Sequence, residues 1–271
     1  MILYKYASAQ SATQTLMNDT LWFSIASSLN DPFETTAGIG HIHHSKFFGE
    51  LNRNRLIELN YRLLCLTRDP LSPIMWSHYA SQHAGMVLGV DSEMAGLEDE
   101  ENCILPAQYG GIIYTRTKPI FGYGKKAITF DHTASENGFN SELLQFLQRN
   151  FLYKSSEWHY EEEVRVIKSM RSLLGILPYE IDDAYWPKSS NGAAFKIPTK
   201  SIREIYLGYR FEIFDEEQMS DIFKFITSAA PNATIYVTYP DRDSWRLVAQ
   251  KVDDWRLYLQ QTFSPGIIGP E

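Results

Sequence analysis

Residues 158–167 have the sequence Trp-His-Tyr-Glu-Glu-Glu-Val-Arg-Val-Ile, in which three consecutive carboxylates run directly into an apolar stretch. The apolar half, 164–167, is rich in β-branched residues and predicts a strand. Because alternate residues of an extended chain share a face, Glu161, Glu163 and Arg165 are expected to point the same way, and the glutamate between the first two the opposite way. Arg165 beside Glu163 is then expected to keep that carboxylate ionised.

This acidic segment has two interpretations. Carboxylates held on a firm strand suit the stabilisation of a developing cation, or a hydrogen bond to a sugar hydroxyl. The alternative is a solvated acidic turn at the edge of a strand, because structural ion-pair networks produce similar clusters. Residue types and spacing leave both open. In the first interpretation Glu163, which heads the strand, is the residue most directly tied to the chemistry.

Outward from this strand, apolar runs and helical stripes alternate irregularly. Short apolar or aromatic runs predict strands at 2–6, 21–24, 63–67, 86–90, 112–114, 202–207 and 234–238. Helical patterns lie at 8–18, 45–62, 74–83, 141–153 and 215–226, and the last is opened by a capping box of Asp215 and Gln218. The elements show no βαβ period, so they predict an α+β fold with a mixed, bent (split) β-sheet and flanking helices.

The organisation expected is one continuous domain over residues 1–263, followed by a loose tail at 264–271. The chain of 271 residues has no internal repeat, low-complexity linker or break in composition that would divide it. Its length would allow either one large domain or two small ones, and the continuity of composition favours one.

Composition excludes several classes of protein. A net charge of −8 argues against non-specific nucleic-acid binding, which needs clustered Lys and Arg. Two cysteines, Cys65 and Cys103, cannot build a disulfide framework or a Cys-rich zinc site. No segment approaches the ~20 apolar residues of a membrane span, and the N-terminus lacks a signal-peptide pattern. A cytoplasmic location without membrane attachment is therefore expected.

Residues 75–83, Met-Trp-Ser-His-Tyr-Ala-Ser-Gln-His, form a second informative segment. On a helix Trp76, Tyr79, Ala80 and His83 lie on one stripe, which predicts packing on the sheet with His83 at its edge. His78 lies off that stripe and is a candidate catalytic residue. The alternative is a structural role, which is the commoner one for a lone histidine.

Two further segments carry candidate ligand-binding residues. Lys5, between Tyr4 and Tyr6, is either a cation aimed at a diphosphate or the outward residue of an edge strand. The stretch 41–44, His-Ile-His-His, is too tightly spaced for a typical metal site and is expected to be surface loop. No metal is therefore expected, and there is no Walker loop, Rossmann glycine fingerprint or nucleophile elbow.

Taken together, four segments in order resemble the bacterial family catalogued as domain of unknown function 2971. They are the Tyr-Lys-Tyr start at Tyr4 to Tyr6, the Asn-Asp-Pro-Phe-Glu turn at 30–34, the strand and helix from Cys65 to Ala80, and the Trp-x-Tyr-Glu-x-Glu-x-Arg segment at 158–165. Ile-Tyr-Leu-Gly at 205–208 also fits this pattern. Each segment is weak alone, and the combination is specific.

That family is similar in layout to ADP-ribosyltransferases, and this resemblance implies an enzyme that cleaves NAD and transfers ADP-ribose to an unknown acceptor, either protein or nucleic acid. It implies a toxin or phage-defence setting with an antitoxin or regulatory partner. Lys5 takes the first-motif position, where the pattern commonly has His, and Tyr79 is the nicotinamide-stacking candidate. The implied NAD-binding residues are Tyr4, Lys5, Tyr6, Trp76, Tyr79 and Arg165. The implied catalytic residues are Glu163, Glu161 and His78.

The chemistry expected is cleavage of a glycosidic bond through an oxocarbenium-like state, which a placed carboxylate stabilises. One alternative is a non-catalytic member of the fold that binds a nucleotide or partner. Another is a hydrolase of a different glycosidic or phosphodiester bond that uses Glu163 and His78. The leading interpretation predicts that the candidate residues converge on one cleft, namely Tyr4, Lys5, His78, Tyr79, Glu161 and Glu163.

Overall fold

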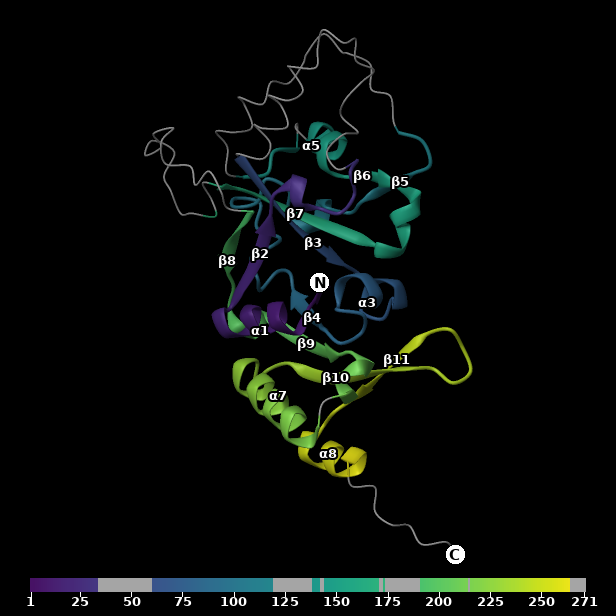
Figure 1. Ribbon diagram of the computed structural model, residues 1–271. Coiled ribbons are helices and arrows are strands. Elements are labelled where there is room, and N and C mark those ends of the chain that lie inside the picture. The colour runs from purple at the N-terminus through teal and green to yellow at the C-terminus, as the bar shows by residue number, and fades with distance from the viewer. Residues whose placement is uncertain are drawn as a thin grey trace, which may run out of the picture. The chain divides into compact units, whose positions relative to one another are not determined.

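The computed structural model describes residues 1–33, 60–118, 138–141, 144–170, 173, 191–213 and 215–263. It combines helices with parallel and antiparallel strands, so the predicted α+β class with a mixed sheet is confirmed (Figure 1). Contacts divide the chain into two compact units. The first unit contains Met1–Thr20, Thr67–Ala95 and Lys196–Glu271, and the second contains Leu21–Leu66 and Gly96–Phe195. A single domain over 1–263 stays a prediction, and the tail at 264–271 lies outside the described residues.

The first unit is built on a mixed sheet whose strands follow the order β11-β10-β9-β4-β1. β1 (Ile2–Ala7) is antiparallel to β4 (Met86–Asp91), and β4 is antiparallel to β9 (Ile202–Leu207). β9 runs parallel to β10 (Thr234–Pro240), which forms an antiparallel pair with β11 (Leu247–Lys251). The strands predicted at 2–6, 86–90, 202–207 and 234–238 are thus confirmed.

β1 is not an edge strand at the position of Lys5. Lys5 pairs with Leu88 on one side, and its neighbour Tyr4 pairs with Thr67 on the other. The alternative that made Lys5 the outward residue of an edge strand is therefore wrong. A short aromatic run at a chain start does not reveal that later segments will pair with both of its edges.

Helices of the first unit follow from capping and from apolar stripes. α1 (Ala9–Asn18) begins after Ser8, whose hydroxyl accepts a hydrogen bond from the Ser11 N–H, and the predicted capping box of Asp215 with Gln218 opens α7 (Glu216–Ala229). In α7 the predicted stripe buries Met219, Phe223 and Ile226. The remaining helices are α3 (Pro73–Tyr79), α8 (Trp255–Phe263) and the 3-10 turns η7 (Thr199–Ser201) and η8 (Tyr209–Ile213).

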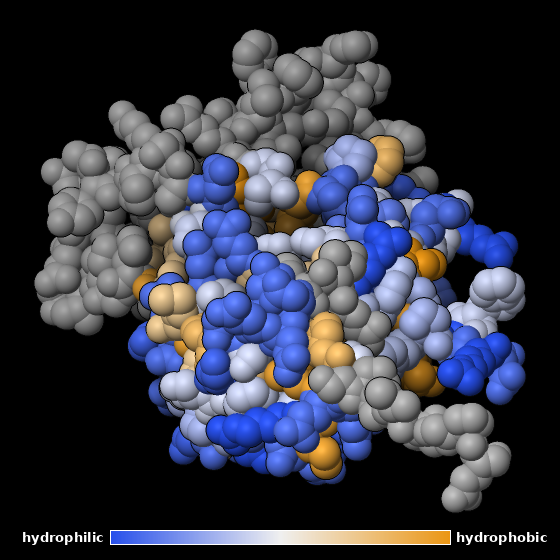
Figure 2. All heavy atoms as spheres, turned by 60° about the horizontal axis from the view of Figure 1, so that its bottom comes forward, coloured by the Kyte–Doolittle hydropathy of each residue, from blue (hydrophilic) through white to orange (hydrophobic). Residues whose placement is uncertain are grey.

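Figure 2 looks onto the end of the molecule that carries α7 and α8. Hydrophilic residues dominate the visible face, and apolar side chains appear as scattered patches between them. Trp245 and Leu257 are examples of exposed large apolar residues in this part of the chain. Isolated apolar side chains of this kind are normal on a protein surface and define no docking face.

The second unit is centred on β3 (Tyr61–Thr67). All residues of this strand except Thr67 belong to the second unit. β3 pairs antiparallel with β2 (Thr20–Ser24) at Leu63 and also pairs with β7 (Glu163–Ser169). β8 (Gly192–Lys196) lies beside β2. A separate parallel pair consists of β5 (Ile113–Thr115) and β6 (Tyr153–Ser155). The predicted strand at 164–167 is confirmed, and it begins at Glu163 as expected.

The core of the second unit is apolar and includes Ile167 of β7. It gathers Tyr61, Leu63, Leu105, Leu147, Phe151 and Ile167 with their neighbours. α5 (Leu144–Phe151) contributes two of these residues, and the unit also holds the 3-10 turns η1 (Ala26–Ser28), η3 (Ala107–Tyr109) and η5 (Ser156–Glu161). Every residue of β7 is buried, so its charged side chains need partners within the protein.

The helix predicted at 74–83 ends early. α3 stops at Tyr79, and Ser81, Gln82 and His83 follow with positive φ angles of 48, 55 and 70°. The N–H of Gly85 then donates to the carbonyl of Ala80, which closes this left-handed turn. Most of the helix predicted at 45–62 lies outside the described residues, and its last residues, 61 and 62, belong to β3.

Candidate functional site

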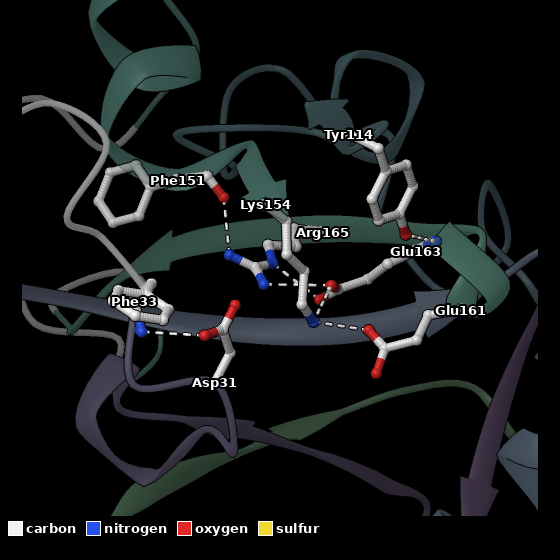
Figure 3. Close-up of polar contacts among 8 residues, drawn as sticks. All are labelled: Asp31, Phe33, Tyr114, Phe151, Lys154, Glu161, Glu163 and Arg165. Carbon is white, nitrogen blue, oxygen red and sulfur yellow. Dashed lines mark hydrogen bonds and ion pairs between the residues drawn. The ribbon is translucent and has the colours of Figure 1, made fainter. Parts of the chain in front are cut away.

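Lys154 lies at the centre of a buried group of charges in the second unit. Its Nζ donates to Oε2 of Glu161 at 2.6 Å and to Oε2 of Glu163 at 3.0 Å (Figure 3). The three side chains come from different elements: Lys154 from β6, Glu161 from the end of η5, and Glu163 from the start of β7. One ammonium group therefore joins two carboxylates that would otherwise repel each other.

Arg165 completes this group, which we call the ion-pair cluster: Lys154, Glu161, Glu163 and Arg165. Its guanidinium donates two hydrogen bonds to Glu163, from Nε to Oε1 at 2.7 Å and from Nη2 to Oε2 at 3.1 Å. Nη1 donates to the carbonyl of Phe151 at 2.7 Å. Arg165 is fully buried, and Glu161 and Glu163 are each 4% exposed. The interpretation of residues 161–163 as a solvated turn is therefore wrong for both of these carboxylates.

The turn at Glu162 explains how both carboxylates reach Lys154. Ser155 caps η5 by accepting from the N–H of Glu157, and Glu162 then adopts a left-handed conformation with φ of 42°. Glu161 is thus not part of the strand, so strand alternation was the wrong reason for the predicted grouping. The grouping itself is present, and the left-handed residue between the two carboxylates, Glu162, is exposed.

The electrostatics keep Glu163 ionised, as expected. Burial alone would raise the pKa of Glu163, but the adjacent guanidinium of Arg165 and then the ammonium of Lys154 hold that pKa well below its ordinary value. Lys154 also lies 4.9 Å from the centre of the Trp158 ring, a favourable cation–π distance. The carboxylate of Glu163 therefore stays ionised near neutral pH.

Two residues near the cluster were missed by the sequence analysis. Lys154 is one, and the signal for it was indirect: buried carboxylates need a cation, and 153–155 is a short polar strand. Asp31 is the other. It is 4% exposed and accepts a hydrogen bond from the N–H of Phe33, and Figure 3 shows its carboxylate pointing towards the guanidinium of Arg165. Asp31 lies in the turn at 30–34, of which residue 34 lies outside the described residues.

A hollow of about 750 Å³ adjoins the cluster on the side of β5 and η5. Its lining residues are Tyr114, Arg116, Ser156, Glu157 and His159. Tyr114 links the hollow to the cluster, because its hydroxyl oxygen accepts the backbone N–H of Glu163 at 2.9 Å. Burial and the charge of Glu163 raise the pKa of Tyr114 to about 12, so this hydroxyl is neutral.

In the first unit, Tyr6 and Trp76 have packing roles. The hydroxyl of Tyr6 donates to the carbonyl of Asp69 and accepts the N–H of Ser72, and its ring meets Trp76 edge-on at 5.5 Å. Trp76 is fully buried, and its indole N–H donates to the carbonyl of Pro70. Both aromatic side chains are therefore bound by the protein itself.

Tyr4 belongs to a different contact set on the same strand. Its hydroxyl donates to Oε2 of Glu204 at 3.0 Å, and the same oxygen accepts from the hydroxyl of Tyr206 at 2.9 Å. Gly89, which pairs with Tyr4, makes room for this contact, because a Cβ there would lie 2.8 Å from the Cβ of Glu204. Burial and the Glu204 carboxylate raise the pKa of Tyr4 to about 12.

The remaining candidates of the first unit lie on α3 and after it. His78 is exposed, and its ring meets that of Tyr79 at 6.1 Å. His83 lies in the left-handed turn after α3, where its ring stacks on Trp76 at 6.3 Å and contacts Tyr209 at 5.0 Å. Burial and then the charge of Arg210 lower the pKa of His83, which is therefore neutral near pH 7.

The structure thus brings together Glu161, Glu163 and Arg165 in the second unit. In the first unit it brings Tyr6 to Trp76 and His78 to Tyr79. Lys5 belongs to one unit and Glu163 to the other, so the convergence of all candidates on one cleft stays a prediction.

Metal and membrane features can be stated for the described residues only. Across them, no group of three or more His, Cys, Asp or Glu side chains is placed to hold a metal ion. The histidines at 41–44 lie outside the described ranges, so their expected place in a surface loop is untested. Every helix in the described part of the chain is too short or too polar to span a membrane.

Comparison with known protein families finds a match for part of the chain. Residues 75–166 match the model of a family described as protein of unknown function (DUF2971). This match supports the family resemblance inferred from the motifs, over a segment that runs from α3 into β7 and includes the whole acidic segment. No curated protein and no solved structure matches the chain.

Proposed function

Starting from the similarity to this family of unknown function, we propose that the chain is an ADP-ribosyltransferase-like enzyme that uses NAD as its substrate. It breaks the bond between nicotinamide and ribose and transfers ADP-ribose to an acceptor, in the setting of a toxin or phage-defence effector. The observation that carries the proposal is the ion-pair cluster, in which the ammonium group of Lys154 is held between two buried carboxylates.

The cluster supports this chemistry because it already stabilises a cation. Cleavage of the nicotinamide–ribose bond develops positive charge on the ribose, and a fixed carboxylate lowers the energy of that charge. Glu163 is fixed by Arg165, and Glu161 by Lys154. In the proposed reaction the ribose approaches the carboxylate pair where the ammonium of Lys154 now lies, so Lys154 has to yield one of its contacts.

The proposed step balances in atoms and charge. The C1′–N bond breaks and its electron pair leaves with nicotinamide, whose ring nitrogen becomes neutral. The C1′ carbon takes a lone pair from an oxygen or nitrogen of the acceptor, and the proton of the acceptor passes to solvent. Glu163 and Glu161 stabilise the cationic ribose between these events and are not consumed.

The family resemblance names further candidate NAD-binding residues, which lie in the first unit. Tyr4, Lys5 and Tyr79 are proposed to bind NAD directly, because their side chains are only partly buried. Tyr6 and Trp76 are buried and bonded to backbone carbonyls, so we assign them a supporting role beneath the others. Arg165 likewise acts through Glu163, as a positioning residue.

One observation favours a second candidate, a non-catalytic member that binds a nucleotide or a partner. Both carboxylates are buried and paired with cations, which is also the arrangement of a structural ion-pair network. The hydrolase that would combine Glu163 and His78 gains no support of this kind from the described residues.

The test compares nicotinamide release from NAD by wild type, Glu163→Gln and Glu161→Gln, with cell extract as the source of acceptors. Removing one well-placed charged stabiliser is expected to lower the rate about 10²–10³-fold. Glu93→Gln is the matched control, because Glu93 is exposed and lies in the first unit. Equal rates for wild type and both cluster variants would reject the assignment of the carboxylates, and no release by any form would favour the non-catalytic candidate.

Each variant has to be assayed below its own melting temperature. A partly exposed Glu163 would allow Glu163→Gln to fold like wild type. Glu163 is instead buried between two cations, so the neutral amide leaves Arg165 and Lys154 with weaker partners. A thermal melt of each variant separates a loss of chemistry from a loss of folded protein.

A further inference from the structure

We propose that the hollow beside the ion-pair cluster is a binding site for a ribonucleotide. The lining residues are those that this ligand class requires: an aromatic ring, a guanidinium, a hydroxyl, an imidazole and a carboxylate. The inference deepens the proposed function by locating a nucleotide moiety, and it rests on that function only for the link to NAD. The hollow itself belongs wholly to the second unit.

The size of the hollow leaves room for more than a simple anion. Pockets for small organic ligands usually enclose about 300–1,000 Å³. The hollow, at about 750 Å³, is within that range and far larger than one phosphate group needs. A ligand that fills it must therefore carry more than a phosphate.

The ring of the ligand is assigned to the corner between Tyr114 and His159. Their ring centres lie 6.0 Å apart with planes at 79°, which is an edge-to-face pair. Such a corner offers the face of one ring and the edge of the other to a flat heterocycle, an arrangement that aromatic groups favour. Tyr114 is anchored through its hydroxyl to the backbone of Glu163, so the corner is held in place.

The phosphate is assigned to Arg116, with Ser156 and His159 as further donors. Arg116 is exposed and lies just after β5, and among the described residues its guanidinium has no hydrogen bond or ion pair. A planar guanidinium binds phosphate oxygens in a bidentate manner. The hydroxyl of Ser156 and the imidazole of His159 line the same hollow and can donate to the remaining oxygens.

The carboxylate of Glu157 favours a ribonucleotide over a plain anion as the ligand of the hollow. A carboxylate in the lining repels phosphate, so its presence disfavours a site for inorganic anions. The same carboxylate accepts hydrogen bonds from a vicinal diol, which is how acidic side chains recognise ribose in nucleotide-binding proteins. A ligand with a ring, a ribose and a phosphate satisfies all five lining side chains, whereas phosphate alone conflicts with one.

The experiment is a calorimetric titration of the full chain with AMP, adenosine and inorganic phosphate. We expect one AMP per chain, with adenosine and phosphate each bound more weakly. Arg116→Met should weaken AMP at least about tenfold and leave adenosine unchanged, because only AMP loses a charge-assisted hydrogen bond. Arg203→Met is the matched control, since Arg203 is an exposed arginine on β9 of the first unit.

A second pair of variants tests the ring contact. Tyr114→Phe keeps the ring and should retain adenosine binding, whereas Tyr114→Leu should lose it. Failure of AMP to bind at millimolar concentration, or equal effects of Arg116→Met and Arg203→Met, would overturn the proposal. Binding of inorganic phosphate as tight as AMP would overturn it as well. Binding of AMP without any release of nicotinamide from NAD would support this site and reject the catalytic function, so the two failures are distinguishable.

Discussion

Two regions of the molecule each contain a buried or half-buried carboxylate, and the partners of the two carboxylates differ in charge. In the first unit Glu204 accepts hydrogen bonds from the neutral hydroxyls of Tyr4 and Tyr206, a group that we call the tyrosine cluster. In the second unit Glu163 is held by two cations, Lys154 and Arg165. The tyrosine cluster is partly open to solvent, whereas the ion-pair cluster is closed to it.

The difference shows what burial demands of a charge. A carboxylate that keeps some contact with water can be satisfied by neutral donors, because solvent shares the cost of its charge. A fully buried carboxylate needs opposite charges nearby, and a buried ion pair often contributes no more stability than apolar residues of the same volume would. The four charged side chains of the ion-pair cluster are therefore weak evidence for added stability.

The largest effect that separates the two regions is expected from Arg165→Met. This change leaves Glu163 buried with only one cation, and breaking a buried pair in this way typically costs about 3–5 kcal/mol. Urea unfolding at neutral pH measures the cost. Tyr6→Phe provides the comparison in the first unit, because it removes a buried neutral hydroxyl with two hydrogen bonds and should cost about 1–2 kcal/mol.

A double variant sharpens this prediction. Adding Glu163→Gln to Arg165→Met removes the carboxylate that lost its partner, so part of the lost stability should return. If the double variant is less stable than wild type by the sum of the two single effects, Arg165 and Glu163 are not coupled. The comparison between charged and neutral clusters would then lose its basis.

Acid is expected to weaken the ion-pair cluster. The folded-state pKa of Glu163 lies below its unfolded value, so its contribution to stability is present above the unfolded pKa, about 4.3, and is lost as pH falls through the folded pKa. The free energy of unfolding of wild type should therefore fall below about pH 5. Glu163→Gln should show a shallower decline over the same range, and identical slopes would contradict the assignment.

Alkali is expected to weaken the tyrosine cluster, because the pKa values of its tyrosines are raised rather than lowered. Burial and Glu204 raise the pKa of Tyr4 to about 12 and raise that of Tyr206 further. The unfolded chain releases these protons near pH 10, so stability is present below that value and is lost as pH rises. Tyr206→Phe should reduce the loss between about pH 10 and 12. Tyrosinate absorbance, followed through the titration, should show one fewer late-ionising tyrosine in that variant.

Much of the fold could be predicted from local patterns. The strand that follows Glu163, the capping box of Asp215 and the apolar stripe of α7 depend on residues close together in sequence, and all are present. Strand pairing could not be predicted, because it joins distant segments. For that reason an edge-strand position was predicted as one alternative for Lys5, although β1 pairs with a strand on each side at its middle.

The candidate site was predictable only in part, for the same physical reason. Glu161, Glu163 and Arg165 are neighbours in sequence, so their grouping could be anticipated. Lys154 and Asp31 reach this part of the second unit through tertiary packing, and neither the polar strand around Lys154 nor the turn around Asp31 shows by itself which residues lie nearby. The left-handed turn at Glu162 was also hidden, because glutamate has no preference for that conformation.

The smallest predicted effect concerns the left-handed turn after α3. A left-handed conformation costs a residue with a Cβ about 1–2 kcal/mol, and glycine avoids this cost while losing roughly 0.5–1 kcal/mol of chain entropy. Gln82 has φ of 55° and an exposed side chain, so Gln82→Gly should raise the free energy of unfolding by about 0.5–1 kcal/mol. Gln14→Gly makes the same chemical change within the right-handed helix α1 and should lower stability by about 1 kcal/mol. Urea unfolding of both variants measures the change in the free energy of unfolding. The turn is strained at Gln82 only if Gln82→Gly raises this free energy and Gln14→Gly lowers it. If Gln82→Gly lowers stability as Gln14→Gly does, the turn is not strained at this position, and the early end of α3 must be explained by packing of His83 on Trp76 alone.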